Sequence, residues 1–219
     1  MCAAEARPAR VAMLGGTFDP VHMGHLRSAV ELREALELDR VHMVPARVPP
    51  HRATPGVSAE RRAALLALGI GDTPGLAVDD REITRDGPSY SADTLASLRE
   101  ELGPQARLVM ALGHDAYLNL AEWHEPQRLF DLAHIVVIDR PDHDRPLAPA
   151  LQELVAGREV SDVETLMQAP AGSLLALRLP TRMAISATSI RERLRRGDSI
   201  RYLVPEAVER DLLARGLYA

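Results

Sequence analysis

Two histidines stand three residues apart in the stretch LGGTFDPVHMGHL, residues 14–26. The stretch follows an apolar run at 11–14 and leads into an amphipathic segment from Gly24, an order that predicts a strand, a glycine-containing loop and a helix. Such a loop brings backbone N–H groups and the positive end of a helix dipole to one point, which suits an anion. A cationic imidazole at a helix N-terminus is unfavourable unless negative charge neutralises it, so His22 and His25 indicate a bound phosphate.

The same residues allow other interpretations. Gly15 and Gly16 alone indicate only a turn, because their surroundings match neither the GxGxxG fingerprint nor the GxxxxGK[ST] loop. His22 and His25 could be two ligands of a structural metal, although no third ligand stands nearby at a usual spacing. The loop could also do no more than cap a helix.

A second group of hydroxyls with an arginine stands near the other end of the chain, in the sequence ISATSIR at 185–191. A helix is expected to begin about Ser189 and to carry Arg191 in its first turn. Hydroxyl donors, free helix N–H groups and a guanidinium together form an anion site. The alternative is an ordinary Ser/Thr cap with a solvent-facing arginine. Two anion sites on one chain suggest a polyphosphate held between them.

The elements that must position these residues are short apolar runs alternating with helical patterns. Strands are expected at 11–14, 41–44, 76–78, 108–112, 135–138 and 174–179, and helices at 24–36, 58–68, 91–102 and 205–215. In the first helix the expected face comprises Leu26, Ala29, Val30, Arg33 and Leu36, and Ser91 is the expected cap of the third. The alternation predicts an α/β fold, a Rossmann-like, doubly wound, mostly parallel sheet with helices on both faces. Ligands of such sheets bind beyond the carboxyl ends of the strands, where the loop at 15–25 falls.

Composition limits the classes of protein that remain. The 219 residues are 46% hydrophobic and 26% charged with a net charge of −5, typical of a soluble globular domain. Arginine far outnumbers lysine, and without a long basic run neither nucleic acid nor a membrane is an expected partner. Cys2 is the only cysteine, which excludes an intrachain disulfide. No apolar run has the length of a signal or membrane segment, so a cytoplasmic location is expected.

One domain spanning 1–219 is the simplest organisation, with a helical part at about 186–219 packed on it. The segment 139–151 is rich in proline and charge and is expected to be an irregular surface loop; its acidic residues and His143 could alternatively bind a metal. The oligomeric state stays open, and a homo-oligomer is compatible with the sequence.

The motifs resemble one family in their order along the chain. GGTFDPVHMGH is similar to the GG[TS]FDPxHxGH motif of bacterial nicotinate-nucleotide adenylyltransferases, in the HxGH nucleotidyltransferase superfamily, and 185–191 is similar to ISSTxIR, with Ala187 replacing a serine. Pro49–Arg52 resembles the PPHK loop with arginine replacing lysine. Ser89–Leu95 resembles SYT-x-DTL with Ser91 replacing threonine. Gly113–Asp115 resembles the GxD turn, and Trp123 stands where that family has a tryptophan.

The resemblance implies transfer of the adenylyl group of ATP to nicotinate mononucleotide in NAD biosynthesis, with Mg²⁺ bound mainly through the ATP phosphates and no metal site on the protein. It implies catalytic roles for His22, His25 and Arg191. Residues expected to bind ATP are Gly15, Gly16, Thr17, Phe18, His22, Gly24, His25, Gly113, Asp115, Ser186, Thr188, Ser189 and Arg191. Residues expected to bind the mononucleotide are Asp19, His51, Arg52, Thr94, Trp123 and His124.

Alternatives to this function remain. Another adenylyltransferase would act on nicotinamide mononucleotide or on phosphopantetheine, although the latter enzymes resemble TFDPxTxGH rather than the sequence at 17–25. A nucleotide-binding module without catalysis would need only the phosphate loop. Trp123 is either a platform for the pyridine ring or a core residue.

Overall fold

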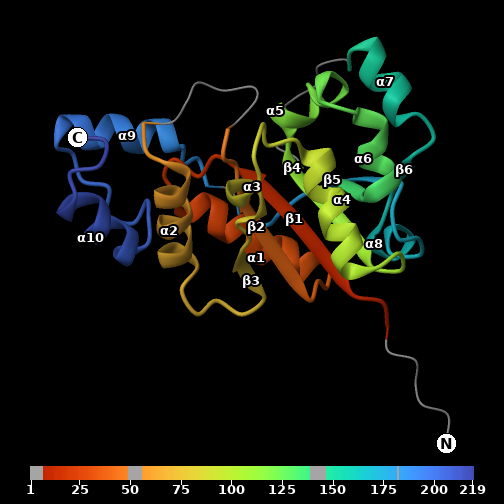
Figure 1. The fold of residues 1–219 in the computed structure, drawn as a ribbon, viewed down its shortest axis with the longest axis horizontal. Coiled ribbons are helices and arrows are strands. Elements are labelled where there is room, and N and C mark those ends of the chain that lie inside the picture. The colour runs from red at the N-terminus through yellow and green to blue at the C-terminus, as the bar shows by residue number, and fades with distance from the viewer. Residues whose placement is uncertain (1–6, 49–55, 139–146, 182) are drawn as a thin grey trace, which may run out of the picture.

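The computed structural model describes residues 7–48, 56–138, 147–181 and 183–219 (Figure 1). One seven-stranded sheet has the order β3-β2-β1-β4-β5-β7-β6, and every pair of neighbouring strands is parallel. The strands are β1 (Arg10–Gly16), β2 (Arg40–Pro45), β3 (Leu76–Val78), β4 (Arg107–Gly113), β5 (His134–Ile138), β6 (Glu159–Val160) and β7 (Leu174–Leu177). The chain builds outward from β1 to β3 and then returns to the other side of β1, so the order confirms the predicted Rossmann-like fold.

Ten α-helices and one 3-10 helix are assigned within these described ranges. They are α1 (Met23–Ala35), α2 (Ala59–Ile70), α3 (Arg81–Thr84), α4 (Ser91–Leu102), α5 (His114–Tyr117), the 3-10 helix η1 (Leu120–Glu122), α6 (Pro126–Leu132), α7 (Pro149–Val155), α8 (Val163–Leu166), α9 (Ala187–Arg196) and α10 (Glu206–Ala214). None of them is long and apolar enough to cross a membrane.

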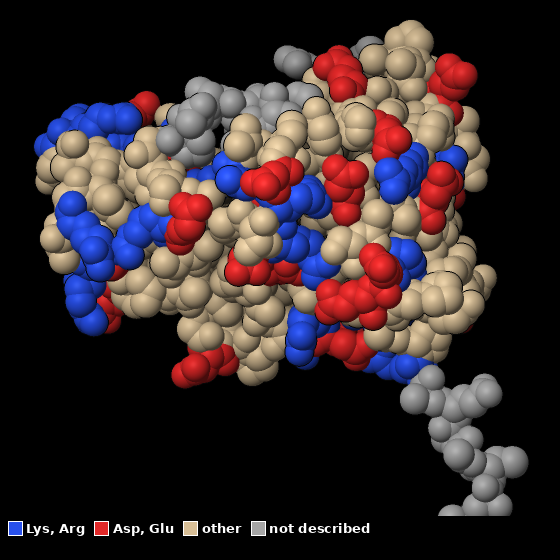
Figure 2. Space-filling view, viewed as in Figure 1, with Lys and Arg blue, Asp and Glu red and all other residues tan. Residues whose placement is uncertain are grey.

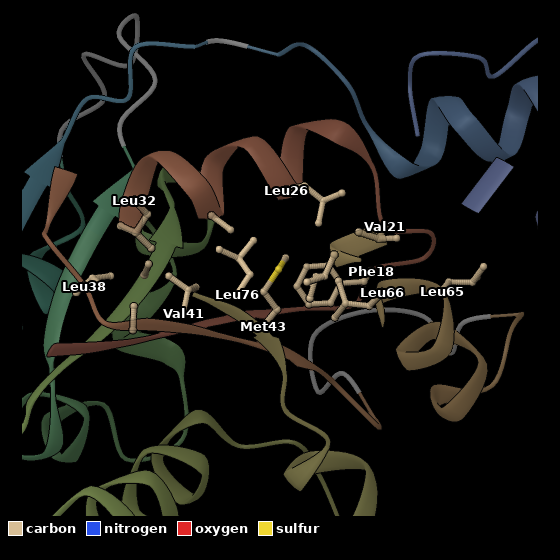
Figure 3. Packing of buried hydrophobic residues seen from close by; sticks show 14 of the residues in the cluster. Phe18, Val21, Leu26, Leu32, Leu38, Val41, Met43, Leu65, Leu66 and Leu76 are labelled. Carbon is tan, nitrogen blue, oxygen red and sulfur yellow. The ribbon is translucent and has the colours of Figure 1, made fainter. Parts of the chain in front are cut away.

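A hydrophobic core lies on each face of the sheet, because successive strand residues point to opposite sides. Along β1, Ala12 belongs to one core, whereas Val11 and Met13 belong to the other. The first core holds the buried faces of α1, α2, α9 and α10, and the second those of α4, α6 and α7. Figure 3 shows the first core between α1 and the sheet, with Phe18, Met43 and Leu66 among its buried side chains. Because both faces are covered, the strands read as nearly continuous apolar runs.

The C-terminal helices lie beside α2 at one end of the molecule, far from α7 and β6 (Figure 1). Apolar residues of α9 and α10 belong to the same core as those of α1 and α2. Arg61 of α2 and Asp211 of α10 form an ion pair between the two helices. The residues at 187–214 therefore share their hydrophobic contacts with the helices that follow β1 and β2.

Several predicted boundaries were wrong. Ser91 is the first residue of α4 rather than its cap, and Tyr90 occupies the cap position without a side-chain hydrogen bond. The buried face of α1 runs through Leu32 rather than Arg33, which is half-buried. The last predicted strand ends at Leu177.

The predicted loop at 139–151 lies mostly outside the described residues, but its end is helical. Proline suits the first turn of a helix, and α7 begins at Pro149. Leu151 is fully buried in the second core, so this end of the segment is not a surface loop.

Candidate active site

The two central strands end side by side at the carboxyl edge of the sheet. Leu14 of β1 pairs with Ala111 of β4, and the strands run on to Gly16 and Gly113 respectively. The strand order reverses between these two strands, and the carboxyl edge of the sheet at such a switch point is where folds of this kind bind ligands. Gly113, predicted to bind ATP, is exposed with open space where a Cβ would stand, and Asp115 is exposed in the first turn of α5.

His22 and His25 lie together at the start of α1. Their rings are stacked with centroids 3.6 Å apart and planes 19° from parallel. His22 caps the helix: its Nδ1 accepts a long 3.4 Å hydrogen bond from the His25 backbone N–H. Because Nδ1 is an acceptor, the proton of the neutral ring lies on Nε2, which is therefore a donor.

Burial lowers the pKa of His22 from 6.5 to about 4. Only 6% of the residue is exposed, so the ring is neutral at pH 7 without a ligand. A cation at this ring would therefore need a neighbouring anion because of its burial. Two of the first N–H groups of α1 are already engaged, that of Met23 by Leu203 O at 2.9 Å and that of His25 by His22. An anion here would meet mainly the imidazoles and the helix dipole.

Close packing fixes the two imidazoles. Phe18 is 2% exposed and sets its ring edge-on to His25 with centroids 5.0 Å apart, so this predicted ATP-binding residue lies in the core as a support. A side chain at Gly24 would come within 3.1 Å of the His22 ring and 3.8 Å of Ile185 Cβ. The absence of a side chain at Gly24 therefore makes room for the His22 ring, with Ile185 at an ordinary contact distance on the same side.

Arg191 connects α9 to the loop after β1. Its Nη1 donates to Asp19 O at 2.7 Å, and its Nη2 donates to Thr188 Oγ1 at 3.2 Å. α9 begins at Ala187, two residues earlier than expected, because Ser186 is its N-cap. The Ser186 Oγ accepts a hydrogen bond from Ser189 N at 3.1 Å. The cap is thus an ordinary one, but the arginine does not simply face solvent. The two predicted anion sites, 172 residues apart in sequence, meet at Asp19.

A buried arginine of α2 also binds the loop after β1. Arg62 is 1% exposed, and its guanidinium donates to Thr17 O at 2.5 Å and Ala46 O at 2.6 Å. Burial lowers its pKa, with Asp19 the first of the charges that oppose this. Arg62 therefore ties the loop after β1 to the loop after β2, which leads to the predicted substrate residues His51 and Arg52. Those two residues lie outside the described part of the chain.

The remaining predicted residues gather around the start of α4. Tyr90 stacks on the exposed ring of His124 with centroids 4.1 Å apart. Trp123 is half-buried against the second core, so it combines a core contact with partial exposure. The Thr94 hydroxyl is fully buried and donates to Glu82 Oε1 at 2.7 Å. This hydroxyl is already engaged in holding the start of α4. A ligand carboxylate at this place would therefore bind the nearby backbone N–H groups rather than the side chain of Thr94.

Sequence reasoning missed Tyr90, Arg62 and Tyr218, whose hydroxyl donates to Asp19 Oδ1. Tyr90 stood inside a motif that was already recognised. Arg62 stands at the spacing of Leu65, Leu66, Gly69 and Ile70, on the apolar face of α2, which could have indicated a buried arginine. Nothing local relates Tyr218 to a loop 199 residues away.

Within the described ranges, a dedicated metal centre finds no support in the donor set. Among the described residues, no three or more histidine, cysteine or acidic side chains are grouped as metal ligands. The alternative of a structural metal on His22 and His25 therefore lacks a third ligand in this part of the chain.

The chain is similar to proteins of one family over nearly its whole length. Residues 13–193 match the cytidylyltransferase-like family. A probable nicotinate-nucleotide adenylyltransferase of Pseudomonas syringae pv. tomato is 46% identical over 211 residues, covering 96% of this chain and 94% of that protein. One of Marinobacter nauticus is 48% identical over 204 residues, with 93% and 94% covered.

Solved structures show the same fold. Nicotinic acid mononucleotide adenylyltransferase of Plasmodium falciparum complexed with NaAD has a TM-score of 0.70 at 15% identity, covering 96% of this chain and 97% of that one. A putative nicotinate-nucleotide adenylyltransferase from Vibrio parahaemolyticus has a TM-score of 0.63 at 17% identity, with 96% and 95% covered. Together with the paired histidines and Arg191 at the end of β1, the sequence identities show that this chain belongs to the nicotinate-nucleotide adenylyltransferases of the cytidylyltransferase-like family.

Proposed function

We propose that this protein transfers the adenylyl group of ATP to nicotinate mononucleotide, producing nicotinate adenine dinucleotide and pyrophosphate. The observation that carries the proposal is that Arg191 of α9 donates to the backbone oxygen of Asp19, in the loop that leads from β1 into the stacked pair His22 and His25. The names of relatives that are 46% and 48% identical point to the same reaction.

The reaction needs donors and positioning more than a protein nucleophile. A phosphate oxygen of the mononucleotide attacks the α-phosphorus of ATP, and the bond from that phosphorus to the oxygen that joins it to the β-phosphorus breaks. Pyrophosphate leaves with the electron pair. Negative charge grows on the α-phosphate and the leaving group, so preorganised N–H donors lower the barrier.

The roles of the chain's residues follow from their chemistry. His25 is assigned to the α-phosphate, with His22 beside it as an Nε2–H donor. Arg191 is assigned to the β- and γ-phosphates, supported by Ser186 and Thr188. Gly15, Gly16 and Gly24 are assigned to the nucleotide as backbone contacts, with Gly113 at the end of β4 and Asp115 in the first turn of α5. A bound phosphate would also favour the protonated form of His22, which burial otherwise disfavours.

The mononucleotide is assigned to the residues around the start of α4. Trp123, beside the Tyr90–His124 stack, offers a flat surface for a pyridine ring. Backbone N–H groups near Thr94 would bind the nicotinate carboxylate. His51 and Arg52 would bind the phosphate, together with the region of Asp19.

Magnesium is proposed to arrive with ATP as part of the substrate. Mg²⁺ keeps several waters and often binds through substrate phosphates, so it needs few protein ligands. The described residues offer no carboxylate cage, and no step is assigned to a metal held by the protein. A cytoplasmic location stays a prediction.

The surface charge agrees with an anionic substrate. In Figure 2, arginine side chains gather where α9 and α10 lie, whereas acidic and basic residues are interspersed over the rest of that face. Arg193, Arg195 and Arg196 are exposed on the helix that carries Arg191. Residues 187–219 carry seven arginines against five acidic residues in a chain of net charge −5, and this small local excess of positive charge would attract a polyphosphate.

The test is pyrophosphate release from MgATP with three acceptors compared side by side. Nicotinate mononucleotide should support turnover with the highest kcat/KM, because donors built for a carboxylate are left unpaired by an amide. Faster turnover with nicotinamide mononucleotide or phosphopantetheine would reassign the substrate. ATP binding without turnover on any of the three would leave a nucleotide-binding module.

A further inference from the structure

Asp19 lies between two donors from the C-terminal part of the chain. Its backbone oxygen accepts from Arg191 Nη1 at 2.7 Å, and its carboxylate Oδ1 accepts from the hydroxyl of Tyr218. The other carboxylate oxygen, Oδ2, is 3.6 Å from Arg191 Nη1. The Asp19 side chain is 12% exposed and that of Arg191 is 24% exposed, so water screens their charges only partly.

Tyr218 is a fixed donor in this contact. A carboxylate only accepts hydrogen bonds, so the phenol must donate. Burial, followed by the hydrogen bond to Asp19, raises the pKa of Tyr218 above its ordinary value of 10, so the hydroxyl keeps its proton at neutral pH. The ring is half-buried against the first core, beyond the end of α10. The hydroxyl is therefore held in place by the packing of its ring.

The distance between Asp19 and Arg191 matters for a ligand. Charge-assisted hydrogen bonds between a guanidinium and a carboxylate are typically about 2.7–2.9 Å long and often bidentate. The 3.6 Å gap is longer, so the carboxylate attracts Arg191 without occupying its N–H groups fully. A carboxylate released from Tyr218 would be expected to close this gap and compete with a phosphate for the same N–H groups.

We propose that Tyr218 is a positioning residue for adenylyl transfer: its hydroxyl holds the Asp19 carboxylate back from Arg191 and so keeps the guanidinium available to the ATP phosphates. The proposal rests on the proposed function, because it takes ATP as the ligand of Arg191. It assigns to Tyr218 an effect on ATP that operates through Asp19 and Arg191, without contact with the nucleotide.

The test is a double-mutant cycle read by calorimetric binding of a non-hydrolysable ATP analogue with Mg²⁺, in the absence of mononucleotide. Tyr218→Phe keeps the packed ring and should weaken binding about tenfold, the scale of one hydrogen bond to a charged group. Tyr202→Phe is the matched control: Tyr202 is 84% exposed on the same C-terminal part, and its variant should bind like wild type.

The second edge of the cycle separates positioning from general stability. Asp19→Asn removes the competing charge, so the double variant Asp19→Asn/Tyr218→Phe should bind the analogue as well as Asp19→Asn alone. A Tyr218→Phe protein that binds like wild type overturns the proposal. An equal weakening by Tyr218→Phe in both backgrounds also overturns it, because a merely structural residue acts independently of the Asp19 charge.

Steady-state kinetics supply a second readout. Tyr218→Phe should raise KM for ATP more than KM for nicotinate mononucleotide, because the N–H groups of Arg191 that bind ATP are the ones for which the freed Asp19 carboxylate competes. A rise confined to the mononucleotide would overturn the route through Arg191. If the wild-type protein binds the analogue but forms no dinucleotide, the proposed function fails, whereas the binding cycle still decides the role of Tyr218.

Discussion

The neutral ring of His22 makes the stability of the ligand-free protein depend on pH in a defined range. Burial lowers its pKa from 6.5 to about 4. At about 1.36 kcal/mol per pKa unit, this difference corresponds to about 3 kcal/mol in favour of the neutral form in the folded state. That is a large part of the roughly 5–15 kcal/mol that stabilises a typical domain.

The sign follows from proton binding. Between pH 6.5 and 4 the unfolded chain takes up a proton at His22 that the folded protein excludes, so stability falls as the pH falls through this range. The stabilisation is fully present above pH 6.5 and is lost toward pH 4. His134 is also buried, and its pKa is also lowered mainly by burial. The pH dependence of the wild-type free energy of unfolding therefore contains contributions from both histidines.

His22→Asn isolates the contribution of His22. Asparagine is a good N-cap and can accept from the His25 N–H in place of the imidazole, while His134 is unchanged. Urea unfolding of both proteins without ligand, at intervals from pH 7 to 4, should show the wild-type free energy of unfolding falling by about 3 kcal/mol more than that of the variant. Parallel curves would refute the assignment of His22 as a buried neutral cap.

Three further predictions concern the residues around the phosphate loop and the pyridine site. Arg62→Met should lower the free energy of unfolding by about 3 kcal/mol or more in urea unfolding, because each buried carbonyl left unpaired costs about 1–3 kcal/mol. A loss below about 1 kcal/mol would contradict the role of Arg62 as a link between the loops. Arg191→Ala should raise KM for ATP and Arg191→Lys should restore it only in part, whereas Arg195→Ala on the same helix should raise KM for ATP far less, because it removes only part of the local excess of positive charge. Unaltered ATP kinetics in Arg191→Ala would place that arginine outside the site. Nicotinate mononucleotide should quench the fluorescence of Trp123, the single tryptophan, saturably and without ATP, and Trp123→Phe should raise KM for the mononucleotide. Fluorescence that does not change when the mononucleotide is added would make Trp123 a core residue only.

The sheet could be predicted well because local pattern and tertiary environment agree. The central strands are covered on both faces, so they read as apolar runs, and each predicted one overlaps an observed strand. β6 has only two residues, and α3, α5 and α8 have four each, too few to show a periodicity. The start of α7 was missed because its proline was read as a loop signal, although proline also suits a first helical turn.

In the candidate site, too, some residues could be predicted from the sequence and others could not. Glycines, histidines and hydroxyls within one short motif could be predicted, because the strand-loop-helix order alone places them together. The link between Arg191 and Asp19 was foreseen only as two anion sites facing one polyphosphate, and not as a contact. The contacts of Tyr218 with Asp19, and of Arg62 with Thr17 and Ala46, depend on how distant helices pack. No local pattern specifies such contacts.

The most direct test of the central claim follows the phosphates of ATP. Incubation with nicotinate mononucleotide and ATP labelled at either the α- or the γ-phosphorus should place the α-label in the dinucleotide and the γ-label in pyrophosphate. His25→Ala should slow both products equally, by about 10²–10³, the scale of one lost preorganised donor. Transfer of the γ-label to the mononucleotide, or a dinucleotide without the α-label, would contradict attack at the α-phosphorus. A His25→Ala rate within a few-fold of wild type would contradict the role of the paired histidines.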